Sequence, residues 1–275
     1  MVGEKSRTAG VFKYIIALAA LVIAAFPLLW MFRVGVMRAG ETIALSSLFR
    51  TGFTMQNYRD LFAAGIIARP LFNSLVVGGV VTLGNLLFCF MVGYVLARYT
   101  FIGKKLLFAT VIGVLMIPAH ILIIPLYVLS LKVGIYDSYF ALILPWLVNP
   151  LGIFLTRQYI ETIPPSLEEA ARVDGAGEMR ILIQVVMPLC KPILAVLAIQ
   201  VFFTNWNSFL FPFILTSSES VRTLPVALAM LQGHQAIDWQ HLMAGSSLAV
   251  LPVLVLFLLM QRQIVAGVTA GSVKQ

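Results

Sequence analysis

Long apolar stretches alternate with short polar ones along most of the chain. A helix needs about 20 predominantly apolar residues to cross the hydrocarbon core of a bilayer. Six stretches meet this requirement and predict six transmembrane helices, at about residues 14–32, 71–97, 106–131, 138–156, 192–217 and 242–261. The fourth is the weakest, because Pro145, Asn149 and Pro150 interrupt it.

The composition supports this interpretation. Of the 275 residues, 60% are hydrophobic and 11% are charged, whereas soluble domains carry about 25% charged residues. We therefore predict an all-α integral membrane protein with one transmembrane domain at residues 14–262, an N-terminal segment at 1–13 and a tail at 263–275. The first span is expected to be retained, since no small-residue cleavage site of a signal peptide follows it.

Lysine and arginine residues indicate which loops face the cytoplasm. The short loop after the second span holds Arg98, Lys104 and Lys105 and no acidic residue. Both termini and the polar run at 157–191 share this basic character, so all are predicted to be cytoplasmic. The net charge of +8 follows from the same bias. Because no basic stripe with interleaved aromatic residues occurs, no nucleic-acid partner is expected.

The polar run at 157–191 lies between the fourth and fifth predicted spans. It holds five acidic residues: Glu161, Glu168, Glu169, Asp174 and Glu178. Ser166 followed by Glu169 is a capping-box pattern, which predicts a helix that starts at Ser166 and continues through Arg172. Gly175 is suited to stop this helix, because glycine tolerates the left-handed conformation.

A second short helix is predicted in the same run, from about Glu178 to Met187. An acidic residue in its first turn complements the helix dipole. Pro188 and Pro192 are then expected to break the chain before the fifth span.

The small and charged residues of the first short helix suit a docking element. Ala170, Ala171 and Ala176 would let it sit deep in a groove, while Glu169 and Asp174, together with Glu168 and Arg172, supply charges at the rim. The alternative is a solvated loop whose helix lies on the lipid surface. The residues alone leave both open, although interfacial helices favour Lys and Arg over acidic residues.

The segment Glu169-Ala170-Ala171-Arg172-Val173-Asp174-Gly175-Ala176, followed by Val185, Met187 and Pro188, resembles the EAA motif of ABC importer permeases. Val185 and Met187 stand where the family pattern has Ile and Leu. Further stretches, at 149–159, 205–212 and 222–226, resemble the carbohydrate-uptake branch. The whole is similar to the second permease subunit of maltose and glycerol-3-phosphate systems.

This resemblance implies a function and a set of partners. The run would form a coupling helix that enters a groove on a cytoplasmic ABC ATPase dimer, with Glu169 making a charged contact and Gly175 forming the turn. The implied coupling residues are Glu168, Glu169, Ala170, Ala171, Asp174, Gly175, Ala176 and Pro188. A second permease subunit and an extracytoplasmic solute-binding protein would complete a system that imports a sugar or related polyol across the cytoplasmic (inner) membrane.

No energy source of its own is evident in the chain. The sequence has no Gly-x-x-x-x-Gly-Lys-Ser/Thr loop, so ATP and Mg are expected on the ATPase and no cofactor on this chain. His120, His234 and His241 lack metal-ligand spacing, and no catalytic residue is predicted. No acidic residue lies deep in a span, which disfavours an ion-coupled carrier. An ABC permease for another solute, an ion-coupled carrier and a mere ATPase anchor stay as alternatives.

Polar residues inside the spans are candidates for the solute path, namely Asn85, Asn205, Trp206 and Asn207. A sugar needs hydrogen-bond partners and an aromatic face, which makes Trp206 and Asn207 the most suggestive pair. The alternative is helix packing, because intramembrane Asn commonly joins helices.

Overall fold

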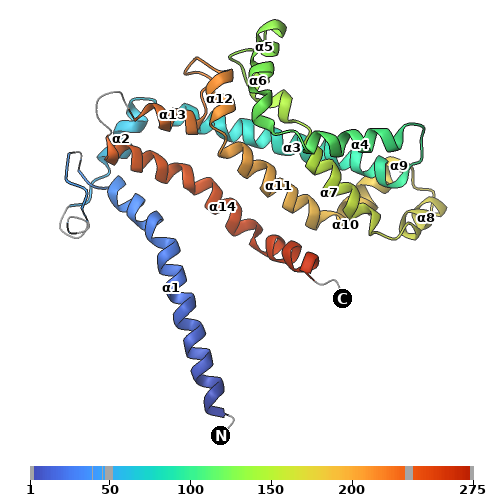
Figure 1. Ribbon diagram of the computed structural model, residues 1–275, viewed down its shortest axis with the longest axis horizontal. Helices are drawn as coiled ribbons and strands as arrows, with labels where there is room; N and C mark the ends of the chain where they lie inside the picture. The colour runs from blue at the N-terminus through green and yellow to red at the C-terminus, as the bar shows by residue number, and fades with distance from the viewer. Residues whose placement is uncertain (1–2, 39, 45, 47–51, 233–237, 273–275) are drawn as a thin grey trace. The chain divides into compact units, whose positions relative to one another are not determined.

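The computed structural model describes residues 3–38, 40–44, 46, 52–232 and 238–272, and every regular element within them is a helix (Figure 1). The α-helices are α1 (Gly3–Gly35), α2 (Gln56–Ala63), α3 (Ala68–Arg98), α4 (Lys104–Leu115), α5 (Ile123–Val133), α6 (Tyr139–Ile143), α7 (Pro150–Glu161), α8 (Ser166–Val173), α9 (Glu178–Ile181), α10 (Met187–Leu189), α11 (Lys191–Trp206), α12 (Leu210–Leu215), α13 (Leu224–Met230) and α14 (Trp239–Ser272). Three other helical segments are η2 (Ala119–Leu122), η3 (Leu144–Trp146) and the π-helical η4 (Leu182–Val186). His234, one of the histidines considered above, lies outside the described residues.

Four helical segments in the described part of the chain are long and apolar enough to cross a membrane: Phe12–Gly35, Ala68–Arg98, Tyr139–Glu161 and Trp239–Leu259. Two bent helix pairs raise the number to six if each pair is one span. These pairs are Lys104–Leu115 with Ala119–Val133, bent by 93°, and Glu178–Leu189 with Lys191–Trp206, bent by 79°. The chain is therefore an all-helical, multi-pass protein.

The predicted third and fifth spans are not continuous helices. In the third, α4 ends at Leu115 and the backbone is extended at Pro118, whose ring and missing N–H disfavour a helix interior. The fifth is broken between α11 and α12. Pro212 cannot donate to the carbonyl of Ser208, so the helix restarts late enough to place Pro212 in the first turn of α12.

The fourth span is interrupted where its sequence predicted. The helix breaks after η3 and resumes with Pro150 as the first residue of α7. Asn149 caps the new helix, since its side-chain oxygen accepts a hydrogen bond of 2.9 Å from the Leu151 N–H. The first and sixth spans lie inside longer helices, α1 and α14, and α14 continues into the predicted tail.

The chain divides into two compact units. Unit 1 comprises residues 1–68 and 227–252, and unit 2 comprises 69–226 and 253–275. In unit 1, the buried Asn57 of α2 donates to the carbonyls of Gly35 and Met37 and so caps the end of α1. The prediction of one transmembrane domain at 14–262 stays a prediction.

In unit 2, α3 is packed closely by its neighbours. A Cβ on Gly93 would lie 2.9 Å from the Cβ of Thr156 and 3.0 Å from the backbone nitrogen of Arg157, so α3 and α7 approach at this glycine. Gly152 of α7 in turn lies against Cys89 and Leu197. Cys89 is buried, as is Cys190, and both thiols are free.

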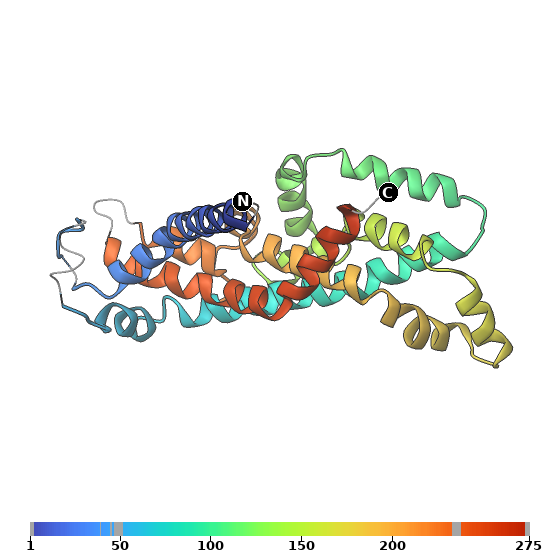
Figure 2. The ribbon, with the colours of Figure 1, turned by 90° about the horizontal axis from the view of Figure 1, so that it is seen from below.

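The two ends of α3 contact different polar segments. Its first turns contact the loop between α12 and α13, since the Asn73 amide donates to the carbonyls of Ser220 and Arg222. Its last turn contacts the run that contains α8 and α9, and this run forms one end of unit 2 in both views (Figures 1 and 2).

Candidate functional site

The helix α8 starts at Ser166, as predicted, but without the predicted capping box. Pro165 occupies the cap position with a helical backbone, at φ −59° and ψ −26°. Its carbonyl accepts from the N–H groups of Glu168 and Glu169, at 3.0 and 3.1 Å. Because the backbone of Pro165 is already helical, Ser166 lies inside the first turn of α8. The expectation that Ser166 caps the helix was therefore wrong.

The end of α8 confirms the role of Gly175. This residue has φ +81° and follows the C-cap residue Asp174. The Gly175 N–H donates to the Arg172 carbonyl at 3.0 Å, and the Ala176 N–H donates to the Ala171 carbonyl at 2.9 Å. This pair of bonds is the Schellman motif, which requires the left-handed conformation that glycine adopts without steric cost.

The predicted second helix is present and contains a π-helical turn. It consists of α9, η4 and α10, which together run from Glu178 to Leu189. Pro188 lies within α10, so it does not itself end the helix. The π-helical segment η4 lies just before Pro188. A regular α-helix would need a backbone N–H at residue 188, and proline has none. The 79° bend comes at Cys190, between Pro188 and Pro192.

The two faces of α8 differ in their surroundings. The inner face carries Glu168, which is only 2% exposed, and Ala171, which packs with Ala176 against the apolar cluster around Phe90 and Ile160. The outer face is open to solvent. It comprises Leu167, Glu169, Ala170, Val173, Asp174 and Gly175, and the Val173 side chain is 88% exposed.

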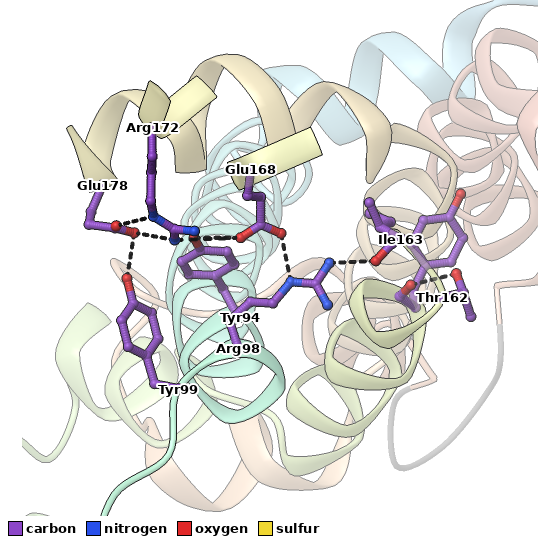
Figure 3. A network of polar contacts seen from close by, with 9 residues as sticks. Tyr94, Arg98, Tyr99, Thr162, Ile163, Glu168, Arg172 and Glu178 are labelled. Carbon is purple, nitrogen blue, oxygen red and sulfur yellow. Dashed lines mark hydrogen bonds and ion pairs between the residues drawn. The ribbon is translucent and has the colours of Figure 1, made fainter. Parts of the chain in front are cut away.

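Arg98 and Tyr94, from the last turns of α3, bind the buried carboxylate of Glu168 (Figure 3). Arg98 Nε lies 2.6 Å from Glu168 Oε1, and the Tyr94 hydroxyl donates to Glu168 Oε2 at 3.1 Å. Arg98 Nη2 also donates to the carbonyl of Ile163 at 2.7 Å. One guanidinium therefore holds both α8 and the turn that precedes it.

A second carboxylate continues this network toward α9. Arg172 forms a bidentate pair with Glu178, with Nε to Oε1 at 2.8 Å and Nη2 to Oε2 at 3.1 Å. The Tyr99 hydroxyl donates to Glu178 Oε2 at 2.6 Å. The hydrogen bonds from Arg172 and then from Tyr99 lower the pKa of Glu178 to about 2, and the bond to Glu178 raises the pKa of Tyr99. Arg172 Nη2 also lies 4.0 Å from Glu168 Oε2, so Arg172 links the contacts of Glu168 with those of Glu178.

The structure separates the predicted coupling residues into two groups. Glu169, Ala170, Asp174 and Gly175 are exposed, whereas Glu168 is buried and Ala171 and Ala176 are partly buried. Sequence reasoning placed Glu168 at the rim, and it missed the α3 side chains that bind it, Tyr94 and Arg98, together with Tyr99. A signal for the burial was present, because Glu168 shares a helical face with Ala171, three residues on.

The predicted solute-path residues do not line one common cavity. Asn85 is fully buried and donates to the Trp146 carbonyl at 2.7 Å. Trp206 is also buried and stacks on Phe202, with ring centroids 5.5 Å apart. Asn207 is exposed and donates to the carbonyl of its own helix at Phe203. Their role in solute passage stays a prediction.

Asn205 lines a small pocket in unit 2 whose other polar residues are Ser74, Ser208 and Thr223, while apolar residues form the rest of its wall. The Thr223 hydroxyl is buried and has no hydrogen-bond partner among the described residues. The pocket has a volume of about 10 Å³, roughly what one water molecule needs. In this conformation it is too small for a sugar ring.

Comparison with known proteins decides the family. Residues 89–269 match the model of the binding-protein-dependent transport system inner membrane component. The chain belongs to this family. It is a multi-pass inner-membrane permease, the transport subunit of an ABC importer and not an enzyme. The resemblance found in the EAA segment is thereby confirmed.

The curated relatives of this permease are of similar length. The arabinooligosaccharides transport system permease protein AraQ of Bacillus subtilis is 35% identical over 257 residues, which cover 90% of this chain and 92% of AraQ. The trehalose transport system permease protein SugB of Mycobacterium tuberculosis is 33% identical, covering 91% of this chain and 93% of SugB.

The permease fold also matches a solved structure. A chain of a bacterial ABC transporter involved in the import of the acidic polysaccharide alginate superposes with a TM-score of 0.78, covering 94% of this chain and 97% of that chain. The identity is 20%, so this likeness concerns the fold.

Proposed function

We propose that this permease subunit forms, with a second permease subunit, the translocation path for a sugar or related polyol. The names of AraQ and SugB, which refer to arabinooligosaccharides and trehalose, support this substrate class. A phosphorylated polyol is the second candidate, since UgpE of Brucella abortus, named for sn-glycerol-3-phosphate, is 28% identical over 274 residues. An extracytoplasmic solute-binding protein delivers the solute.

The outer face of α8 is the proposed docking surface for a cytoplasmic ABC ATPase dimer. The observation that carries this proposal is the 88% exposure of Val173 on a helix that buried side chains hold in place. A rigid element that presents an apolar side chain between carboxylates, here Glu169 and Asp174, loses little conformational entropy when it binds. A partner groove with an apolar floor and a basic rim would complement it.

This docking sets the orientation of the chain across the membrane. The run at 157–191 and both termini lie in the cytoplasm, where the ATPase binds ATP and Mg. Closure of the ATPase dimer displaces α8 and switches the spans between inward- and outward-facing states, a rigid-body transition. The positions of Arg98, Lys104 and Lys105 support this direction through the positive-inside rule.

A single charge on the docking surface tests the ATPase contact. Val173→Asp places a carboxylate where an apolar contact is proposed, and we expect at least a tenfold loss of ATPase co-purification with the permease. Ile102→Asp is the matched control, because Ile102 is an equally exposed apolar residue that lies in the loop after α3 and not on α8. Unchanged ATPase binding by the Val173 variant would refute the docking surface.

Cysteine labelling tests the orientation. Cys89 and Cys190 are buried. In vesicles that hold the permease without the ATPase, a membrane-impermeant maleimide should therefore react with a Val173→Cys variant and spare the native thiols. We expect labelling in inside-out vesicles and none in right-side-out vesicles.

For the substrate class, uptake of arabinotriose, trehalose and glycerol-3-phosphate by vesicles with the reconstituted complex separates the two candidates.

A further inference from the structure

We propose that Arg98 and Glu168 form a positioning pair that makes α8 move as one body with the C-terminal end of α3. The inference rests on the proposed docking of α8 and names the path by which its displacement reaches the spans. The proposal rests on the position of the Arg98 guanidinium, which is mostly buried and lies between α3, the turn before α8 and α8 itself (Figure 3).

The covalent connections of α8 do not fix its direction. On one side, the segment from Thr162 to Pro165 turns the chain after α7, and on the other side Gly175 reverses it at φ +81°. Both connections are bends, and α8 itself has only eight residues. A helix this short is marginal without tertiary contacts.

The apolar contacts of α8 are also small. Its inner face offers Ala171, and the following turn offers Ala176, to the cluster that includes Phe90 and Ile160. Methyl groups bury little area, and the apolar stabilisation scales with the area buried. The orientation of α8 therefore depends on the polar contacts of Glu168.

The pair is buried well enough to act as a single rigid contact. Glu168 is 2% exposed and Arg98 is 11% exposed. The planar guanidinium donates through Nε to the carboxylate and through Nη2 to the Ile163 carbonyl, which fixes its plane. Loss of either partner would leave the other charge buried without compensation, which strongly disfavours the present arrangement.

The same end of α3 also holds α9. The Tyr94 hydroxyl binds Glu168, and the Tyr99 hydroxyl binds Glu178. Arg172 connects these two carboxylates. Both short helices of the run are thus bonded to the last turn of α3 and to Tyr99, the residue that follows it. A displacement of the run therefore reaches α3 directly, in addition to α7 and α11, to which the run is covalently joined.

Distance measurements test the rigid connection without knowledge of the solute. Spin labels at Ser166→Cys on α8 and Ile102→Cys just beyond α3 would be placed in the complete complex with cysteine-free partner chains. We expect one narrow distance distribution that ATP with vanadate leaves unchanged. With Glu168→Gln added, the distribution should at least double in width. A native distance that changes on nucleotide trapping, or a Glu168→Gln distribution that stays narrow, would overturn the proposal.

A second comparison separates this role from docking. Glu168→Gln should lower the amount of co-purified ATPase only about two- to threefold, because α8 loses rigidity, and much less than Val173→Asp does. The amount of solute transported per ATP hydrolysed should fall at least tenfold. Its exposed neighbour provides the contrast, since Glu169→Gln should weaken ATPase binding itself. Arg98→Lys keeps the charge and should recover part of the coupling that Arg98→Gln loses. If Glu168→Gln only weakened ATPase binding, or if it left coupling intact, the positioning role would be wrong.

Discussion

Asp137 holds Ser218 through one carboxylate oxygen. Asp137 Oδ1 lies 3.0 Å from the backbone nitrogen of Ser218 and 3.1 Å from its hydroxyl, although the residues are 81 positions apart. It also accepts from the Ser217 N–H at 2.8 Å. Burial acts to raise the pKa of Asp137, but the bonds from Ser218 and Ser217 outweigh it and lower the pKa. The turn after α5 therefore anchors the loop that follows α12.

Asp137→Asn should loosen this anchor. Hydrogen bonds to a charged acceptor are worth about 1.5–3 kcal/mol and neutral ones about 0.5–1.5 kcal/mol, so we expect a local loss of about 1–2 kcal/mol. Hydrogen exchange at Ser217 and Ser218 would measure it as roughly 5- to 30-fold faster exchange. Asn also tolerates the positive φ of 56° at this position, so backbone strain does not confound the result.

The control for this variant is Glu219→Gln, in the same loop, since the Glu219 side chain is 90% exposed and should contribute little.

The stabilisation by Asp137 should decrease at low pH. Because the native pKa of Asp137 lies below its unfolded value, its contribution is present above the unfolded pKa and is lost as the pH falls through the native pKa. Unchanged exchange in the Asn variant would refute the anchor.

Gly175→Ala should destabilise the end of α8. No atom would lie within 4 Å of the added Cβ, so the cost is the left-handed backbone alone, about 1–2 kcal/mol. The Schellman bonds should loosen, which exposes the N–H groups of Gly175 and Ala176 to exchange. Gly177→Ala is the matched control. Its site is equally open, but its φ of −74° suits any residue, so equal effects at both positions would contradict the explanation.

Gly93→Ala should force α3 and α7 apart. The added methyl group would meet the Thr156 side chain at 2.9 Å and the Arg157 backbone nitrogen at 3.0 Å. Over-packing of this kind costs about 1–3 kcal/mol, and a lower unfolding temperature in detergent would report it. Gly79→Ala, in the same helix with nothing within 4 Å, should be neutral or slightly stabilising, because alanine has the higher helix propensity.

Acidification should release α9 from Arg172 and Tyr99. Glu178 has a native pKa of about 2, below its ordinary value of 4.5. Its contribution is therefore complete above about pH 4.5 and is lost as the pH falls toward 2. Hydrogen-exchange protection of residues 172–181, corrected for intrinsic rates, should decrease over this window. Glu178→Gln should show reduced protection already at pH 7 and no further change between pH 4.5 and 2, and a persistent transition would implicate another group.

Local chemistry explains why several features of α7 and α8 were predictable. The positive φ at Gly175 and the interruption at Asn149 and Pro150 follow from what glycine and proline allow in any protein. The break expected from Pro188 and Pro192 is present as the 79° bend at Cys190 between them, whereas the backbone at single prolines depended on its surroundings. At Pro188 a π-turn accommodated the missing N–H, and at Pro165 the ring fitted the helical backbone, which moved the start of α8 away from a serine cap.

The amino-acid pattern alone was enough to predict an all-helical membrane protein and, through the resemblance of its EAA segment, an ABC permease, because apolar run length and motif spacing are local properties. Which of two adjacent glutamates points inward follows from the packing of α8 on α3. Glu168 and Glu169 are chemically identical, and a side chain on α3, some 70 positions away in the sequence, selects one of them. Such a partner depends on how distant helices pack, and packing is a property of the whole chain that no short pattern encodes.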